Sequence, residues 1–78
     1  MTYKLKFIPS ALKEWNKLAQ PIKTQFKKKL SERLEKPHNK ASRLKGFENH
    51  YKIKLRSLGY RLVYEVNDNE ITVYVIAV

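Results

Sequence analysis

This chain of 78 residues contains no cysteine, and acidic residues are scarce in it. The absence of cysteine excludes a disulfide framework and a thiolate zinc site. His38 and His50 are isolated and lack metal-ligand spacing, so the sequence predicts neither a metal site nor a cofactor. No apolar run approaches the ~20 residues of a membrane-spanning helix, and the N-terminus has no signal-peptide core. Together these absences favour a soluble cytoplasmic protein.

The length allows a single domain, residues 1–78, with no second domain or internal repeat. A domain of this size buries only ~60% of the surface of its unfolded chain, so its core is thin. Apolar residues make up 42% of the chain, with five tyrosines, three phenylalanines and one tryptophan. This composition indicates a globular protein rather than a disordered one.

The shortage of acids leaves a large positive charge. Seventeen Lys and Arg against seven Asp and Glu give a formal net charge of +10. Between Lys23 and Arg61 the sequence holds thirteen basic residues and three acids, whereas the remaining charges sum to zero. A localised positive field favours a polyanionic partner, and nucleic acid is the commonest polyanion in a cytoplasm.

Hydrophobic periodicity predicts two helices in the first half of the chain. Residues 3–7 alternate apolar side chains with lysine, as a half-buried strand does. A helical stripe follows, with Ser10 as the expected N-cap. A second stripe recurs at every fourth residue from Ile22 to Leu34, beginning near Pro21 and ending before Pro37. Their short connection predicts an αα-hairpin.

Three strands are expected in the second half, at residues 50–56, 60–67 and 70–78. The last is apolar on both faces, which is typical of a strand inside a sheet. The predicted fold class is therefore α+β. Its order is β-α-α-β-β-β, with the helical hairpin packed on a four-stranded, mostly antiparallel sheet.

Side-chain alternation puts basic residues on the open face of this sheet. With the apolar residues of the second strand directed at the core, Lys52, Lys54 and Arg56 face away, and Arg61 does so on the third strand. A two-residue turn at Leu58 and Gly59 is expected to join these strands. It sets three pairs opposite each other: Arg56 with Arg61, Lys54 with Val63, and Lys52 with Glu65.

This cationic face has two interpretations. Edge lysines can simply deter aggregation, and Glu65 could neutralise Lys52. Opposed like charges, however, destabilise a sheet, which argues that the arginine pair serves a function. On the second helix, Lys27 and Lys28 belong to a lysine run that is more often a solvated helix face, although such a face can also contact phosphates.

A cluster of Lys and Arg without histidine can in principle cleave RNA. The ribose 2′-OH is the nucleophile, and cleavage needs a base, charge stabilisation on the phosphorane and an acid for the 5′-oxygen. Arginine suits the second role because its planar fork matches two phosphate oxygens. A lysine crowded by other cations has its neutral form favoured, as a base requires.

Four stretches of the chain resemble the RelE toxins of bacterial and archaeal toxin–antitoxin pairs. They are "ALKEWNKL" at 11–18, "KKKL" at 27–30, "RLKG" at 43–46 and, above all, "YKIKLRSLGYRLVY" at 51–64. The similarity covers essentially the whole chain. It implies the RelE fold and an endoribonuclease that enters the ribosomal A site, cleaves mRNA there by 2′-OH attack and so inhibits translation.

The resemblance also implies partners. A RelB-type antitoxin would wrap the toxin and repress their operon with it, so that operator DNA is contacted only indirectly, through the antitoxin. The ribosome with its mRNA would be the target.

Site residues follow from the same resemblance. Lys52 and Lys54 match the catalytic lysines of the family, and Arg61 matches its phosphate-stabilising arginine. RNA or ribosome contacts are implied for Lys45, Arg56, Lys27 and Lys28.

One departure from the family concerns the C-terminal segment. Family members continue past the last strand with a further catalytic arginine and a base-stacking tyrosine, whereas this chain stops at Val78. The resemblance therefore implies a weakly active or inactive short form.

Two rival functions remain open. The first is a degenerate toxin-like module that binds antitoxin or ribosome without cleaving RNA. The second is the related ParE branch, which poisons gyrase. The joint presence of Lys52, Lys54 and Arg61 argues against the ParE branch, since that branch has no need of an RNA-cleaving cluster.

Overall fold

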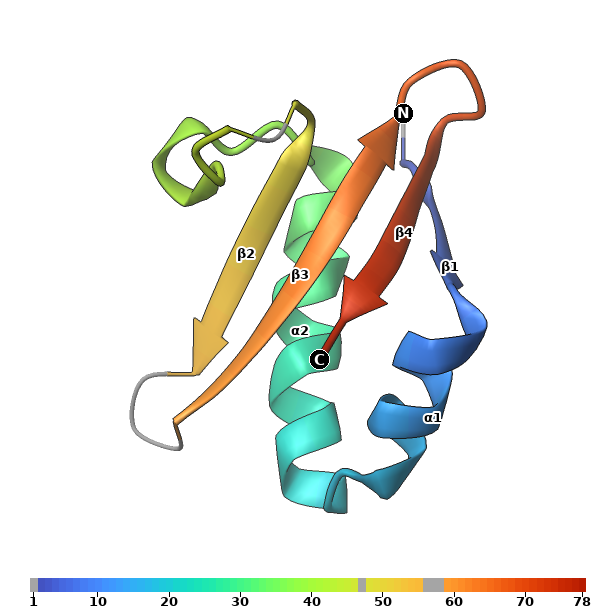
Figure 1. Ribbon diagram of the computed structural model, residues 1–78, viewed down its shortest axis with the longest axis vertical. Helices are drawn as coiled ribbons and strands as arrows, with labels where there is room; N and C mark the ends of the chain where they lie inside the picture. Colours follow the sequence, from blue (N-terminus) through green and yellow to red (C-terminus); the bar gives the residue numbers. More distant parts are fainter. Residues whose placement is uncertain (1, 47, 56–58) are drawn as a thin grey trace.

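The structure is a computed structural model that describes residues 2–46, 48–55 and 59–78 (Figure 1). Its elements follow the predicted order, with one short 3₁₀ helix, η1, added between the second helix and the second strand. They are β1 (Lys4–Phe7), α1 (Pro9–Lys17), α2 (Gln20–Glu35), η1 (Lys40–Ser42), β2 (His50–Leu55), β3 (Tyr60–Asn67) and β4 (Thr72–Ala77). The expected α+β fold is confirmed.

The four strands form one mixed sheet in the order β1-β4-β3-β2. The β2–β3 and β3–β4 pairs are antiparallel, and β1 pairs in parallel with β4 (Figure 1). The strand with two apolar faces, β4, therefore lies between two neighbours, as its sequence predicts. Among the strands β2 pairs only with β3, so it forms one edge of the sheet, where Arg43 makes an isolated bridge with Tyr51.

Helix α1 begins one residue before the expected N-cap. Its first residue is Pro9, Ile8 occupies the cap position, and no side chain caps the helix. Ser10 thus lies inside the first turn, and its assignment as N-cap was wrong. Proline suits this first position because its φ is already helical and it has no N–H to satisfy.

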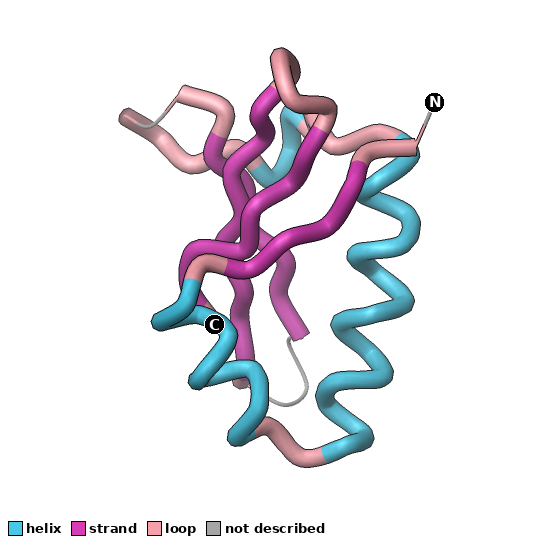
Figure 2. Tube along the Cα trace, turned by 90° about the vertical axis from the view of Figure 1, so that its right-hand side faces the viewer, coloured by secondary structure: helices cyan, strands magenta, loops and turns pink. Residues whose placement is uncertain are grey.

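One hydrophobic core lies between the helices and the sheet. Figure 2 shows α2 running along one face of the sheet. Both helices supply buried side chains, such as Trp15 and Phe26, and these pack with inward-facing residues of β2, β3 and β4. The inward strand residues are Tyr51, Ile53, Leu55, Leu62, Tyr64, Val66, Val73 and Val75. Neither described helix combines the length and apolar content needed to cross a membrane.

The predicted pairing of β2 with β3 was wrong by two residues. Leu55 pairs with Tyr60, and Lys54 stands opposite Arg61 where Val63 was expected. Leu58 and Arg56 lie outside the described residues, while Gly59 has the expected positive φ, 72°. A slip of two residues keeps every side chain on its face, so hydrophobic alternation cannot distinguish the two pairings.

Candidate functional site

The open face of the sheet brings three of the candidate residues together on two adjacent strands. Lys52 stands opposite Val63, and Lys54 stands opposite Arg61. Directly opposed residues on one face have Cβ atoms ~4.5–5.5 Å apart, and like charges so placed destabilise the sheet. The opposed like charges that a purely structural role does not explain are therefore Lys54 and Arg61, where Arg56 and Arg61 were expected.

Glu65 does not stand opposite Lys52. It pairs with His50 across the strands, where His50 Nε2 lies 3.3 Å from Glu65 Oε2. His50 Nδ1 also lies 2.7 Å from the carbonyl oxygen of Glu48. The neutralisation of Lys52 by Glu65, which the purely structural interpretation allowed, is not found, because Glu65 is paired with His50.

A cavity of about 370 Å³ opens on this face, and we call it the open-face cavity. Its cations, Lys52 and Arg61, stand over an apolar lining. The apolar residues are Leu44, Val63, Ala77 and Val78. Neither cation forms an ion pair with a described carboxylate. The arrangement offers positive charge beside a surface on which a flat, weakly polar group such as a nucleobase can rest.

A second cavity of about 370 Å³, the edge cavity, lies between α2, η1 and the outer edge of β2. Lys52 lines it too, so the two cavities adjoin, and Lys54 belongs to this one. Its other cations are Lys29 and Arg33 of α2. Lys29 was predicted only as the last residue of the lysine run 27–29, and Arg33 was not predicted, although both lie on the flank of the apolar stripe through Phe26 and Leu30.

The remaining described residues predicted to contact RNA or the ribosome lie outside the two cavities that contain Lys52. Lys45 is exposed in the loop after η1 and lines a cavity of about 360 Å³ that shares Leu44 with the open-face cavity. Lys27 and Lys28 are exposed on α2, but they line neither of the cavities that contain Lys52. Arg56 lies outside the described residues.

Arg33 is held in place by two neutral oxygens. Its Nη1 donates to the Tyr64 hydroxyl at 3.2 Å, and its Nη2 donates to Ser42 Oγ at 3.0 Å. Tyr64 is fully buried, donates to the Pro37 carbonyl at 2.8 Å and stacks on Tyr51 with ring centroids 5.5 Å apart. Burial raises the pKa of Tyr64, an effect that the neighbouring guanidinium opposes. The phenol of Tyr64 therefore stays neutral.

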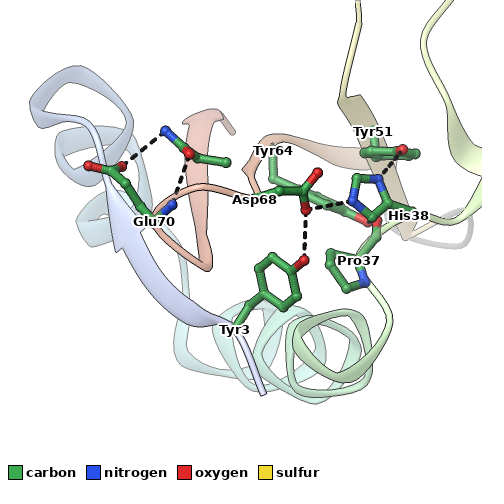
Figure 3. A network of polar contacts seen from close by, with 8 residues as sticks. Tyr3, Pro37, His38, Tyr51, Tyr64, Asp68 and Glu70 are labelled. Atoms are coloured by element: carbon green, nitrogen blue, oxygen red, sulfur yellow. Dashed lines mark hydrogen bonds and ion pairs between the residues drawn. The ribbon is translucent and has the colours of Figure 1, made fainter. Parts of the chain in front are cut away.

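His38 links segments that are far apart in the sequence (Figure 3). Its Nε2 donates to Asp68 Oδ1 at 2.9 Å, and its Nδ1 lies 2.8 Å from the Tyr51 hydroxyl. The Tyr3 hydroxyl donates to the same Asp68 oxygen at 2.7 Å. The bonds from Tyr3 and His38 hold the pKa of Asp68 below its usual value, so it remains an acceptor. This network ties the N-terminus and the β3–β4 turn to the loop after α2.

A further cavity in the described part of the chain lies away from this basic face. Its volume is about 420 Å³, and it lies at the opposite end of β3 from Arg61. Three acids, Glu48, Glu65 and Asp68, are among its lining residues. A polyanion would be repelled there, so the cationic cavities are the better candidate site.

Comparison with known proteins bears on this basic face. Residues 5–78 match the family described as "ParE toxin of type II toxin-antitoxin system, parDE". The mRNA interferase toxin RelE of Escherichia coli K12 is 54% identical over 78 residues, which cover all of this chain and 82% of the relative. The chain belongs to the RelE/ParE family of type II toxins.

Solved structures of RelE agree with the fold. The isolated E. coli RelE toxin superimposes with a TM-score of 0.94 at 53% identity, covering 96% of this chain and 80% of that one. RelE in the intact E. coli RelBE toxin–antitoxin complex gives the same TM-score and identity, covering 96% and 92%. The similar proteins are named for the RelE branch, as Lys52, Lys54 and Arg61 together had indicated. The resemblance noted from the sequence is confirmed.

Proposed function

We propose that this RelE-family toxin is an mRNA interferase, an endoribonuclease that cleaves mRNA in the ribosomal A site. The observation that carries the proposal is the placement of Lys52, Lys54 and Arg61 on one open face. Lys54 stands directly opposite Arg61, and no described acid lines the two adjoining cavities. The name of the E. coli relative, mRNA interferase, supports the same activity.

Each residue has a role in cleavage by the ribose 2′-OH. Lys54, in the middle of the cluster, is the proposed base that removes the proton from the hydroxyl. Arg61 stabilises the negative charge that develops on the phosphorane, because its planar fork can donate to two oxygens. Lys52 lines both cavities and holds the phosphate between them. DNA lacks the 2′-OH and would not react.

The proposal is tested with Arg61→Lys. This variant keeps the charge and loses the two-pronged donor, so single-turnover cleavage of mRNA on programmed ribosomes should fall by ~10²–10³, the usual effect of removing one such donor. Arg61 is exposed, so the melting temperature should stay unchanged. Cleavage at a near-normal rate would show that Arg61 contributes charge alone or nothing.

Contacts with the ribosome are proposed for Lys45, Arg56, Lys27 and Lys28. The last two lie outside the cavities that contain Lys52, so they can act only by binding. Charge reversal of both, Lys27→Glu with Lys28→Glu, should reduce the dependence of ribosome affinity on salt, because fewer counterions are then released. The control reverses Lys4 and Lys13, which are exposed outside the basic middle of the chain. An equal salt slope in both double variants would identify the lysine run as a solvated face.

The proposed partner is an antitoxin of the RelB type, as the RelBE complex of the E. coli relative suggests. Operator DNA would be contacted only through this antitoxin. Such a partner should be acidic where it meets the basic face. It should also cover the apolar lining of the open-face cavity, since exposed apolar surface of this kind favours association.

We also propose that these 78 residues cleave slowly by themselves. The described side chains around the two cavities include a base and two phosphate ligands, but no acid for the 5′-oxygen and no aromatic ring. In the alternative of a degenerate toxin-like module, these residues bind antitoxin or ribosome and do not cleave RNA at all. Cleavage assays on ribosomes distinguish slow catalysis from none.

A further inference from the structure

The edge cavity combines four cations with a mostly polar lining. Lys29, Arg33, Lys52 and Lys54 line it together with Ser42, Ala41 and Ile53. Ile53 is only 1% exposed, so it contributes almost nothing to the surface. No described acid lines this cavity. A ligand here would meet positive charge and hydrogen-bond donors.

The surroundings of the Arg33 side chain favour binding of an anion. It is half-buried, and both of its printed partners, Tyr64 and Ser42, are neutral hydroxyls. Among the described residues no carboxylate pairs with it. Burying a charge without a counter-charge is costly, and a guanidinium has five donors, of which these two bonds use two. The fixed fork is therefore poised to bind a phosphate or a carboxylate.

We propose that the edge cavity is a second phosphate-binding subsite, which holds a backbone phosphate of the RNA next to the one being cleaved. This rests on the proposed function. Lys52 lines both cavities. An RNA strand bound at Arg61 would therefore remain next to positively charged side chains as it passes from one cavity to the other. Arg33 is then a binding residue that positions the strand.

The occupant is RNA rather than the acidic segment of a protein partner. A protein segment gains most of its affinity from apolar and aromatic anchors that fill pockets. The edge cavity offers only Ala41 for such an anchor, whereas the open-face cavity offers four apolar residues. A phosphodiester needs only the charge and the donors that the edge cavity supplies.

The test measures binding of a short single-stranded RNA that carries 2′-O-methyl groups and cannot be cleaved. Each phosphate neutralised on a single strand contributes about 0.7 to the slope of log affinity against log salt. Arg33→Gln should lower the slope by about that amount, and Arg33→Lys should restore the slope with weaker binding. The control Lys13→Gln removes one charge from α1, on a residue that lines none of these cavities, and should leave the slope unchanged.

A second variant guards against misfolding, because Arg33 also bridges α2 to Tyr64 and Ser42. Lys29 is exposed and lines the same cavity, so Lys29→Gln should lower the slope with no change in melting temperature. Replacing one phosphate at a time by a neutral methylphosphonate should locate a position that weakens binding to the unaltered protein but not to Arg33→Gln.

Two outcomes would overturn the subsite. One is an unchanged salt slope in both Lys29→Gln and Arg33→Gln, or no salt-dependent RNA binding at all. The other is weaker binding of an acidic antitoxin peptide by these variants with RNA binding intact, which would assign the edge cavity to the antitoxin. Either result leaves the cleavage assay with Arg61→Lys untouched, so failure here is distinguishable from failure of the proposed function.

Discussion

Lys54→Ala should lower the rate of mRNA cleavage by ~10²–10⁴, the usual contribution of a general base, with little loss of ribosome affinity. The reason is geometric. Lys54 lies opposite Arg61 on the open face and lines the edge cavity, next to the position proposed for the scissile phosphate. The measurement is single-turnover cleavage on programmed ribosomes, together with the equilibrium affinity of the same variant for the same ribosomes.

A second substitution at Lys54 distinguishes a general base from a residue that contributes only positive charge. Lys54→Arg keeps the positive charge but cannot lose its proton in the working pH range, so it should be as slow as Lys54→Ala. Lys13→Ala, on the exposed face of α1, should cleave at the unaltered rate. If Lys54→Arg cleaves normally, or if rate and affinity fall together in Lys54→Ala, then Lys54 only binds phosphate.

Extension of the chain with the C-terminal part of E. coli RelE should raise cleavage by at least ~10². The match covers all 78 residues of this chain but only 82% of that relative, so the relative has further residues with no counterpart here. A general acid contributes ~10²–10⁴ in rate. Stacking on an aromatic ring contributes ~1–3 kcal/mol per base, and it also orients the 2′-OH. The two forms are compared at equal concentration on programmed ribosomes.

The control for this extension is a segment of the same composition in scrambled order. It should leave the rate at that of the 78-residue form, because added charge alone supplies neither an acid nor a positioned ring. In a host without antitoxin, the 78-residue form should be tolerated and the extended form should arrest growth. Equal cleavage by the short and extended forms would mean that Lys52, Lys54 and Arg61 are a complete catalytic set.

The sequence by itself determined the order of the elements and the face on which each side chain lies. Both depend on local periods of 2 and 3.6 residues, so the alternation from Tyr51 to Leu55 and the stripe from Ile22 to Leu34 were sufficient. The sequence also located the excess positive charge between Lys23 and Arg61, because the positions of charged residues along the chain can be read without a fold. The resemblance to RelE toxins, carried by residues 51–64, indicated the family that the comparisons confirm.

Only the tertiary structure decided which charges meet. The pairing of Lys54 with Arg61 is one of two registers that differ by two residues, and a slip of two residues leaves the hydrophobic pattern unchanged. Arg33 joins the site because α2 packs beside the edge of β2, and no local pattern encodes that contact. His38 and Asp68 are 30 positions apart, so their bond exists only once the sheet and the hairpin have packed. Long-range contacts of this kind depend on the whole core, whereas strand and helix periods are properties of a few consecutive residues.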